Sequence, residues 1–178
     1  LIITGELPDG KKKAVLDALL VSLAEHAFSP SSVSARFVAS GGVPLNTAVA
    51  GGVLTMGERH ASADIPAKMF IEGIESCDRE GISIEESAER IVAKYRQEKC
   101  ILNGYHHPQH VRDPRVERLF EVALSKGLYD RHCKLASAIE DMTEKYYSRR
   151  LYLNAPGAFA AIGCDMGLKP NQIKGLII

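Results

Sequence analysis

The chain has 178 residues, of which 46% are apolar, and its 22 Lys and Arg residues are balanced by 22 Asp and Glu residues. A net charge of zero provides no field that would attract nucleic acid or an anionic membrane surface, so we expect neither as a partner. The amino-terminal Leu-Ile-Ile is too short for a signal peptide and no apolar run reaches the roughly 18 residues of a membrane span, so we expect an intracellular, cytoplasmic protein.

The first half of the chain repeats apolar residues at the three-and-four spacing of a helix face, interrupted by glycine, proline and capping residues. This pattern predicts helices over residues 9–25, 31–40, 48–56, 62–79 and 83–99. Pro44 opens the third of these segments, which is rich in Ala and Gly, so we expect it to pack closely in a crowded core. Ser83 and Glu86 form a capping-box pattern at the start of the fifth.

The second half of the chain continues the same pattern. It predicts helices over residues 113–127, 130–149, 157–166 and 170–178. No window shows the alternation that is typical of a strand, so the predicted fold class is all-α, with eight or nine helices. The one stretch that fits no helix is 101–112, which we call the histidine loop because it contains His106, His107 and His110.

Three interpretations of the histidine loop are open. A metal site would place His106 and His110 on one helix face, but Pro108 lies between them and would break that face. The four cysteines show no zinc-type spacing either, so we expect reduced thiols and no bound metal. A purely structural loop is the second interpretation. The third is acid–base and anion-binding chemistry, because Arg112 and Arg115 follow and arginine binds carboxylates through two parallel hydrogen bonds.

Gly-Tyr-His-His-Pro at residues 104–108 is followed by Asp-Pro-Arg at 113–115. These motifs resemble Gly-Tyr-Gly-His-Pro and Asp-Pro-Arg of the citrate synthase superfamily, which also includes citryl-CoA lyase and the lyase module of ATP-citrate lyase. Gly-Glu-Arg-His-Ala-Ser-Ala at 57–63 stands in the place of Gly-Pro-Leu-His-Gly-Gly-Ala, and Leu-Asn-Ala-Pro-Gly at 153–157 in that of Leu-Asn-Val-Asp-Gly. The remaining similar segments, in the family's order, are 1–8 and then 25–26 together with 34–40.

The resemblance implies a helical homodimer with a large helical domain and a smaller helical lobe. Residues 1–178 would be the core portion of one subunit, with the smaller lobe at approximately 64–150 and the remainder in the large domain. It also implies an acyltransferase of the tricarboxylic acid cycle that condenses acetyl-CoA, or another acyl-CoA, with oxaloacetate or a related keto acid. Cleavage of citryl-CoA is the alternative. Coenzyme A is then expected as part of a substrate.

The resemblance also implies roles for individual residues. His60 would donate a hydrogen bond to the thioester oxygen, which carries the charge of the enolate. His107 would polarise the ketone of oxaloacetate, while His26 and Arg115 hold the keto acid. The residues expected to lie along the CoA thioester arm are Asn103, Gly104, Tyr105 and Asn154.

Local sequence alone allows structural roles for the same residues. His60 and His26 follow helical segments, where an imidazole can cap the helix C-terminus. Arg115 would be solvated in the first turn of its helix. Asn154, close to a proline, would be a turn residue.

The chain departs from the family pattern at positions where the chemistry takes place. The family's carboxylate base is replaced by Pro156, which cannot accept a proton. Loss of a general base costs about 10² to 10⁴ in rate. Ala61 and Ser62 replace two glycines of the family motif. The family's loop has one more residue between its histidine and Asp-Pro-Arg than this chain has between His107 and Asp113, so His106 is an alternative to His107. The competing hypothesis is a catalytically lapsed homologue that binds CoA or a carboxylate ligand.

Overall fold

The chain folds into helices joined by short connections. The computed structural model describes residues 1–24, 28–107 and 111–178. The helices of this part are α1 (Gly10–Ser22), α2 (Pro30–Ser40), α3 (Leu45–Val53), α4 (Asp64–Glu80), α5 (Ile84–Gln97), α6 (Pro114–Ser125), α7 (Arg131–Tyr147), α8 (Ala155–Asp165) and α9 (Pro170–Ile177). Within these described ranges, the β-structure is one isolated antiparallel bridge between Tyr105 and Leu153. The predicted all-α class is confirmed.

Capping residues in the sequence set where the helices begin. Ser83 Oγ accepts a hydrogen bond from the Glu86 N–H at 3.1 Å, so the serine half of the predicted capping box is present, while the Glu86 carboxylate pairs with Arg90. α8 begins two residues earlier than predicted. The reason is that Asn154 caps it, since its Oδ1 accepts the Gly157 N–H at 2.9 Å.

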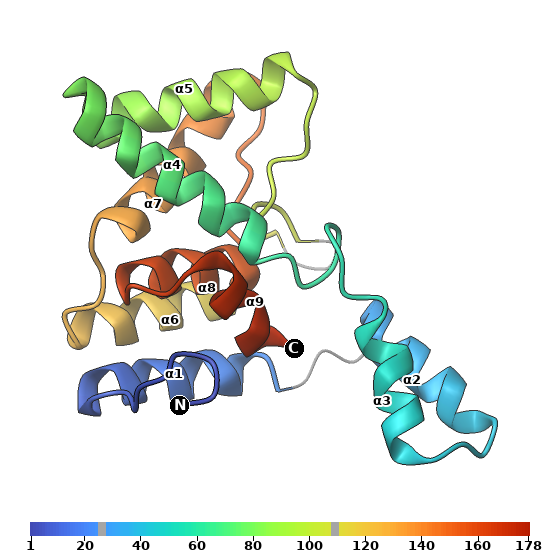
Figure 1. Ribbon diagram of the computed structural model, residues 1–178. Helices are drawn as coiled ribbons and strands as arrows, with labels where there is room; N and C mark the ends of the chain where they lie inside the picture. The colour runs from blue at the N-terminus through green and yellow to red at the C-terminus, as the bar shows by residue number, and fades with distance from the viewer. Residues whose placement is uncertain (25–27, 108–110) are drawn as a thin grey trace.

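α8 is the centre of the hydrophobic core. Its sequence is apolar all round the helix, and such a helix is stable only when neighbours cover every side of it. α4, α6, α7 and α9 provide that cover. In Figure 1, α4, α5 and α7 lie above α8, whereas α1 and α6 lie below it. The amino-terminal end of α8 therefore lies between the two groups of helices.

α2 and α3 form a helical hairpin that stands apart from this core (Figure 1). Two glycines let the helices approach each other: a Cβ at Gly51 would lie 2.7 Å from Val38 Cγ2, and one at Gly52 would lie 2.9 Å from the Ser31 carbonyl oxygen. The predicted close packing of this small-residue segment is confirmed, but its partner is α2 and the place is outside the main core. Phe37 of the hairpin is 75% exposed.

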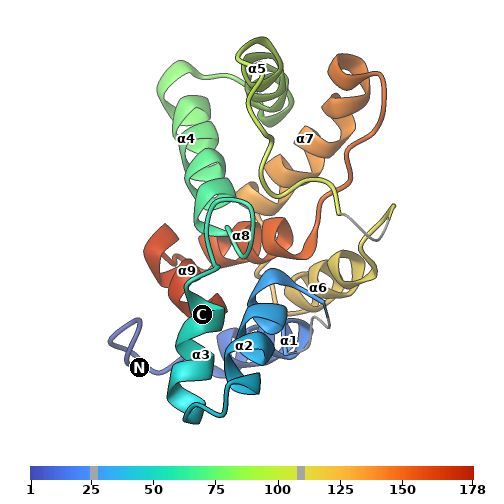
Figure 2. The same ribbon diagram turned by 90° about the vertical axis from the view of Figure 1, so that its right-hand side faces the viewer.

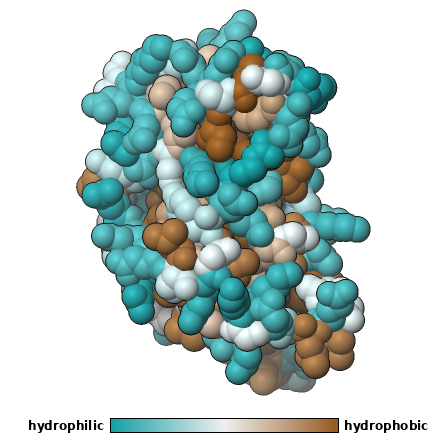
Figure 3. Space-filling model, turned by 90° about the vertical axis from the view of Figure 1, so that its left-hand side faces the viewer, coloured by the Kyte–Doolittle hydropathy of each residue, from teal (hydrophilic) through white to brown (hydrophobic). Residues whose placement is uncertain are grey.

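Figure 3 shows one face of the molecule, on which hydrophilic side chains predominate and apolar ones gather toward the lower end. In Figure 1 the lower end carries the α2–α3 hairpin as well as α1 and the amino-terminal residues, and Leu1, Ile2 and Leu54 are among its exposed apolar residues. None of the described helices is long and apolar enough to cross a membrane. The division into a smaller lobe at 64–150 and a large domain stays a prediction. α6 belongs to the predicted smaller lobe, but it packs on α1 and α8, which belong to the predicted large domain.

Candidate active site

The histidine loop is paired with the segment that joins α7 to α8. The His106 N–H donates to the Tyr152 carbonyl oxygen at 2.7 Å, and the Asn154 N–H donates to the Gly104 carbonyl oxygen at 2.9 Å. The Asn154 side-chain amide adds a hydrogen bond to the His106 carbonyl oxygen at 2.8 Å. Figure 2 shows both segments descending toward α8. This pairing fixes the backbone immediately before His107, which is only 8% exposed.

Two glycines allow the histidine loop to lie against α8. Gly104 has a φ of +91°, and a Cβ there would be 3.1 Å from Gly157 Cα and 3.0 Å from Pro66 Cβ. A Cβ at Gly157 would in turn collide with the Gly104 carbonyl oxygen. Since Pro66 belongs to the first turn of α4, the loop contacts the beginnings of α4 and α8 together.

Asp113 connects the end of the histidine loop to three helices. Its fully buried carboxylate caps α6 by accepting the Arg115 N–H at 3.1 Å, and its Oδ2 accepts the Ala155 N–H of α8 at 2.9 Å. The Arg115 guanidinium binds the same carboxylate through Nε and Nη2, at 2.9 and 2.8 Å. Its Nη1 donates to the Ser22 carbonyl oxygen of α1 at 3.3 Å. One ion pair therefore ties the loop to α1, α6 and α8.

The same contacts determine the ionisation of Asp113. Burial alone would raise the pKa of this carboxyl, but hydrogen bonds from Arg115 and from the Ala155 N–H, together with the Arg115 charge, outweigh it and hold the pKa below its usual range. Asp113 is therefore ionised at neutral pH. Its paired and saturated carboxylate is a weak base that anchors the loop.

His60 lies in the connection between α3 and α4. Its Nε2 is hydrogen-bonded to Ser31 Oγ of α2 at 2.9 Å, so the α2–α3 hairpin orients the imidazole. The next residue, Ala61, has a φ of +58°, and its carbonyl oxygen accepts a hydrogen bond from Lys174 Nζ at 2.7 Å. Ala61 replaces a glycine of the family motif yet keeps the left-handed backbone that glycine favours.

His106 and His107 have different environments. His106 is exposed and has a φ of +77°, a left-handed conformation at a position where the family motif has glycine. His107 is buried. The left-handed backbone of His106 and the burial of His107 favour His107 as the counterpart of the motif's histidine, and this assignment stays a prediction.

The structure brings most of the predicted site residues to one region. Those that lie around the amino-terminal end of α8 are Asn103, Gly104, Tyr105, His107, Arg115 and Asn154. Tyr105 is buried and its hydroxyl donates to the Ala136 carbonyl oxygen at 2.9 Å, so its polar group contacts α7. His60 lies in the connection between α3 and α4, where Ser31 of α2 binds its imidazole. His26 and His110 lie outside the described residues.

Two residues of the site were not singled out from the sequence. Asp113 was predicted only as the first residue of its helix, although the Asp-Pro-Arg motif places it beside Arg115 and could have indicated a pair. Ser31 carries no local signal, because its contact with His60 depends on how α2 packs. Both residues orient groups that the sequence did identify.

Other reactive side chains are few in the described part of the chain. No group of three His, Cys, Asp or Glu side chains is arranged there to hold a metal ion. All four cysteines carry free thiols. Burial, helped by the Asp165 carboxylate, raises the pKa of Cys164 to about 12 and raises that of Cys133 as well. Because neutral buried thiols are poor nucleophiles, Cys133 and Cys164 are weaker candidates for chemistry than the histidines.

Proteins of known structure share the fold and part of the sequence of this chain. The family described as citrate synthase, C-terminal domain, matches residues 1–176. The structure of citryl-CoA lyase from Hydrogenobacter thermophilus is similar over 99% of this chain and 67% of that chain, with 36% identity and a TM-score of 0.86. Citrate synthase from Thermotoga maritima matches 98% of this chain and 46% of its own, with 22% identity and a TM-score of 0.78.

ATP citrate lyase from Methanosaeta concilii, solved in complex with (3S)-citryl-CoA, has 19% identity and a TM-score of 0.73 over 97% of this chain and 28% of its own. The chain thus spans about two thirds of the citryl-CoA lyase and less than half of the other two proteins. The two more distant structures support the fold alone. The family resemblance read from the motifs is confirmed.

Proposed function

The chain belongs to the citrate synthase family, and on that premise we propose that it cleaves citryl-CoA to acetyl-CoA and oxaloacetate. The observation that carries this proposal is the 36% identity with a citryl-CoA lyase over 99% of the chain. Condensation of acetyl-CoA with oxaloacetate, the reaction expected from the sequence, forms the same carbon–carbon bond in the opposite direction. It is the second candidate.

The proposed cleavage uses the two histidines in turn. His107 takes the proton of the citryl hydroxyl, whose oxygen becomes the ketone of oxaloacetate. The electron pair of the broken carbon–carbon bond passes to the thioester, which becomes an enolate. His60 donates a hydrogen bond to the enolate oxygen and stabilises its charge. The fixed backbone before His107 supports this role, because a general base must be held within hydrogen-bond reach of the proton it takes.

Arg115 holds the keto acid in this proposal, together with His26. Three of the five N–H donors of its guanidinium bind protein oxygens, and the others are assigned to a carboxylate of the substrate. Because Asp113 fixes the guanidinium plane before a ligand binds, little side-chain entropy is lost on binding. The thioester arm of CoA then lies along residues 103–105 and Asn154.

The enolate carbon must gain a proton to become the methyl group of acetyl-CoA. Pro156, in the first turn of α8, has no carboxyl group that could supply it. Asp113 binds the same turn, but its lowered pKa leaves it ionised and without a proton to give. We assign the proton to a water molecule. The hydroxide that remains is neutralised by the proton held on His107.

Product formation tests the proposal directly. The full-length protein is incubated with citryl-CoA, and oxaloacetate and acetyl-CoA are measured. His107→Gln is expected to lower the rate by about 10² to 10⁴, whereas His106→Gln, at the exposed neighbour, retains it. If the wild-type protein forms no oxaloacetate, the lyase proposal is wrong. Release of free thiol from acetyl-CoA and oxaloacetate would then support the second candidate.

Pro156 favours a further alternative, a homologue that binds CoA or a carboxylate ligand without turnover. Asp113 cannot replace the missing base, because its carboxylate is already saturated by Arg115 and α8. Calorimetric titration with CoA and with citrate distinguishes the cases. Binding with neither cleavage nor condensation would support the lapsed homologue, and turnover would exclude it.

We also propose that the protein acts as a homodimer, as the family resemblance implies. Light scattering of the full-length protein tests this, and a monomer mass at micromolar concentration would contradict it. The cytoplasmic location stays a prediction.

A further inference from the structure

The segment that joins α7 to α8 is held along both of its edges. One edge pairs with the histidine loop, as described above. On the other edge, the Leu151 N–H donates to Thr143 Oγ1 and the Leu153 N–H donates to the Glu140 carboxylate, both at 2.8 Å. Alternate residues of an extended chain direct their backbone groups to opposite edges, so the two sets of hydrogen bonds do not compete.

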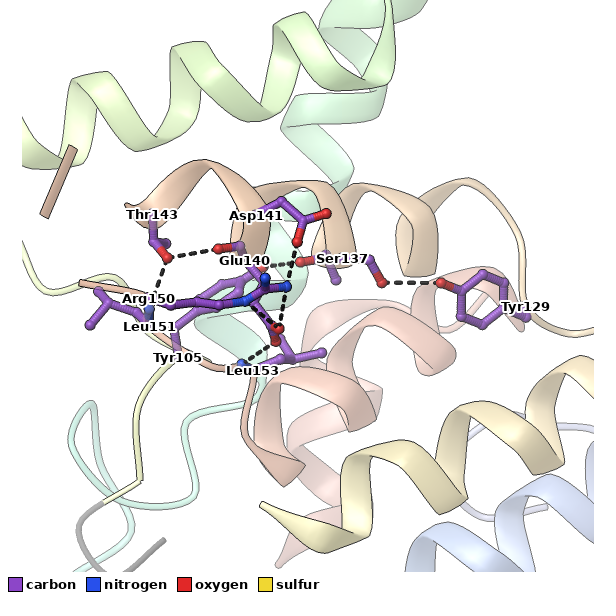
Figure 4. Close-up of polar contacts among 10 residues, drawn as sticks. Tyr105, Tyr129, Ser137, Glu140, Asp141, Thr143, Arg150, Leu151 and Leu153 are labelled. Carbon is purple, nitrogen blue, oxygen red and sulfur yellow. Dashed lines mark hydrogen bonds and ion pairs between the residues drawn. The ribbon is translucent and has the colours of Figure 1, made fainter. Parts of the chain in front are cut away.

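The histidine loop is tied to the same helix. The Tyr105 hydroxyl donates to the Ala136 carbonyl oxygen of α7 in a buried hydrogen bond of 2.9 Å. Ala136, Glu140 and Thr143 are spaced by four and three residues and therefore share one face of α7. Figure 4 shows the contacts of Glu140 and Thr143 with the neighbouring segment, and the Tyr105 ring beside them. One helix face thus binds both segments that flank the amino-terminal end of α8.

The hydrogen bonds of Tyr105 and Thr143 are buried, and the partly buried charge of Glu140 is compensated by Arg150. Thr143 is fully buried, and its hydroxyl donates to the Glu140 carbonyl oxygen at 2.7 Å, which leaves its lone pairs for the Leu151 N–H. The Glu140 side chain is 15% exposed and pairs with Arg150, at 3.0 Å between Oε1 and Nη2. Since Arg150 belongs to the held segment, this ion pair adds to the restraint.

We propose that the α7 face formed by Ala136, Glu140 and Thr143 positions His107 for reaction, an inference that rests on the function proposed above. Side chains of α7 take the place of a third strand. They fix one edge of the 151–153 segment, and its other edge fixes the backbone of His106. A short extended segment has little stability of its own, so the loss of either edge frees it to move. Glu140 and Thr143 are therefore positioning residues that do not touch the substrate.

Amide hydrogen exchange, measured by NMR on the full-length protein, tests the mechanical part of this inference. In Glu140→Ala, protection of the Leu153 N–H is expected to fall about tenfold or more, and protection of the His106 and Asn154 N–H groups, on the far edge, to fall with it. Glu144→Ala removes an exposed carboxylate from the same helix and is the matched control. Faster exchange at Leu153 alone would overturn the inference.

Turnover of citryl-CoA tests the functional part. Thr143→Val keeps the shape of the side chain but removes the acceptor of the Leu151 N–H, and we expect kcat to fall about tenfold to hundredfold with KM changed less than about twofold. Thr143→Ser restores the hydroxyl and is expected to restore most of kcat. A loss of folded protein alone would lower the active fraction without this pattern of rescue.

The two measurements separate failure of this inference from failure of the proposed function. If the wild-type protein turns over citryl-CoA, and both Glu140→Ala and Thr143→Val loosen the far edge without lowering kcat, the inference is wrong. If the wild-type protein is inactive in cleavage and condensation, the proposed function is wrong, and exchange at His106 still decides whether α7 holds the histidine loop.

Discussion

The carboxylate of Asp113 accepts a hydrogen bond from the backbone N–H of Ala155, 42 residues further along the chain, at 2.9 Å. The residue that caps α6 therefore also binds the first residue of α8. Because the same carboxylate is paired with Arg115, the proposed substrate-binding arginine and the start of the central helix are held by one buried charge.

Asp113→Asn should destabilise the protein, because the amide leaves Arg115 without its buried counter-charge. We expect the free energy of unfolding to fall by about 3 kcal/mol. Denaturant titration measures this change. Glu121→Gln removes an exposed carboxylate that pairs with Arg118, and it should leave the stability nearly unchanged. Equal effects of the two substitutions would contradict the assignment of Asp113 as an anchor.

Asp165 should make stability depend on pH in the acid range. Burial alone would raise its pKa, but hydrogen bonds from His132, Cys133 and the Asp130 N–H outweigh it and hold the pKa below its usual range. A carboxyl with a folded-state pKa below its unfolded-state value stabilises the protein above the unfolded-state pKa. This stabilisation is lost as the pH falls through the folded-state value.

The test follows the free energy of unfolding between about pH 5 and pH 3. The decrease on acidification should be smaller in Asp165→Asn than in the wild type. Asp17→Asn, at an exposed position of α1, should keep the wild-type slope. Parallel curves for Asp165→Asn and the wild type would show that Asp165 is not the source.

Gly157→Ala should strain the contact between α8 and the histidine loop, because its Cβ would collide with the Gly104 carbonyl oxygen. We expect a loss of about 2 kcal/mol in the free energy of unfolding. Gly10→Ala, at the start of α1, adds the same methyl group where no atom lies within 4 Å, and should be neutral or slightly stabilising. Thermal unfolding of the two variants gives the comparison.

Ala61→Gly should stabilise the protein, because Ala61 has a φ of +58° and glycine adopts this conformation without steric cost. The expected gain is about 1 kcal/mol. Ala50→Gly, in the exposed interior of α3, makes the same substitution in a helix and should lose about as much. Denaturant unfolding measures both changes in the free energy of unfolding. Opposite signs of the two changes would indicate the left-handed backbone at Ala61.

Pro156→Asp should restore the carboxylate at the first turn of α8 while the fold is kept. An acidic side chain suits a helix N-terminus, so we expect stability to change by less than about 1 kcal/mol. The rate of citryl-CoA cleavage should rise by about 10² or more. Pro156→Asn has nearly the same shape without the ionisable carboxyl group, and a similar rate in both variants would exclude proton donation to the enolate carbon from this position.

Much of the fold could be predicted from the sequence, because its causes are local. Capping residues and helical spacing placed the helices, and the unbroken apolar sequence of α8 is typical of a helix covered on every side. The motifs identified the family, and the roles that they predict for His60, His107 and Arg115 stay predictions. The start of α8 was placed too late because Asn154 was considered a turn residue, whereas its side chain caps the helix.

The partners of the site residues could be learned only from the tertiary structure. Ser31 with His60, Asp113 with Ala155, and Glu140 with Leu153 are separated by 29, 42 and 13 residues. No local pattern relates such positions, since a hydrogen bond needs donor and acceptor within about 3 Å, and helix packing decides whether they meet. Local propensity and apolar patterning therefore account for the helices and the family motifs, while the packing of α7 and α8 determines what holds the histidine loop in place.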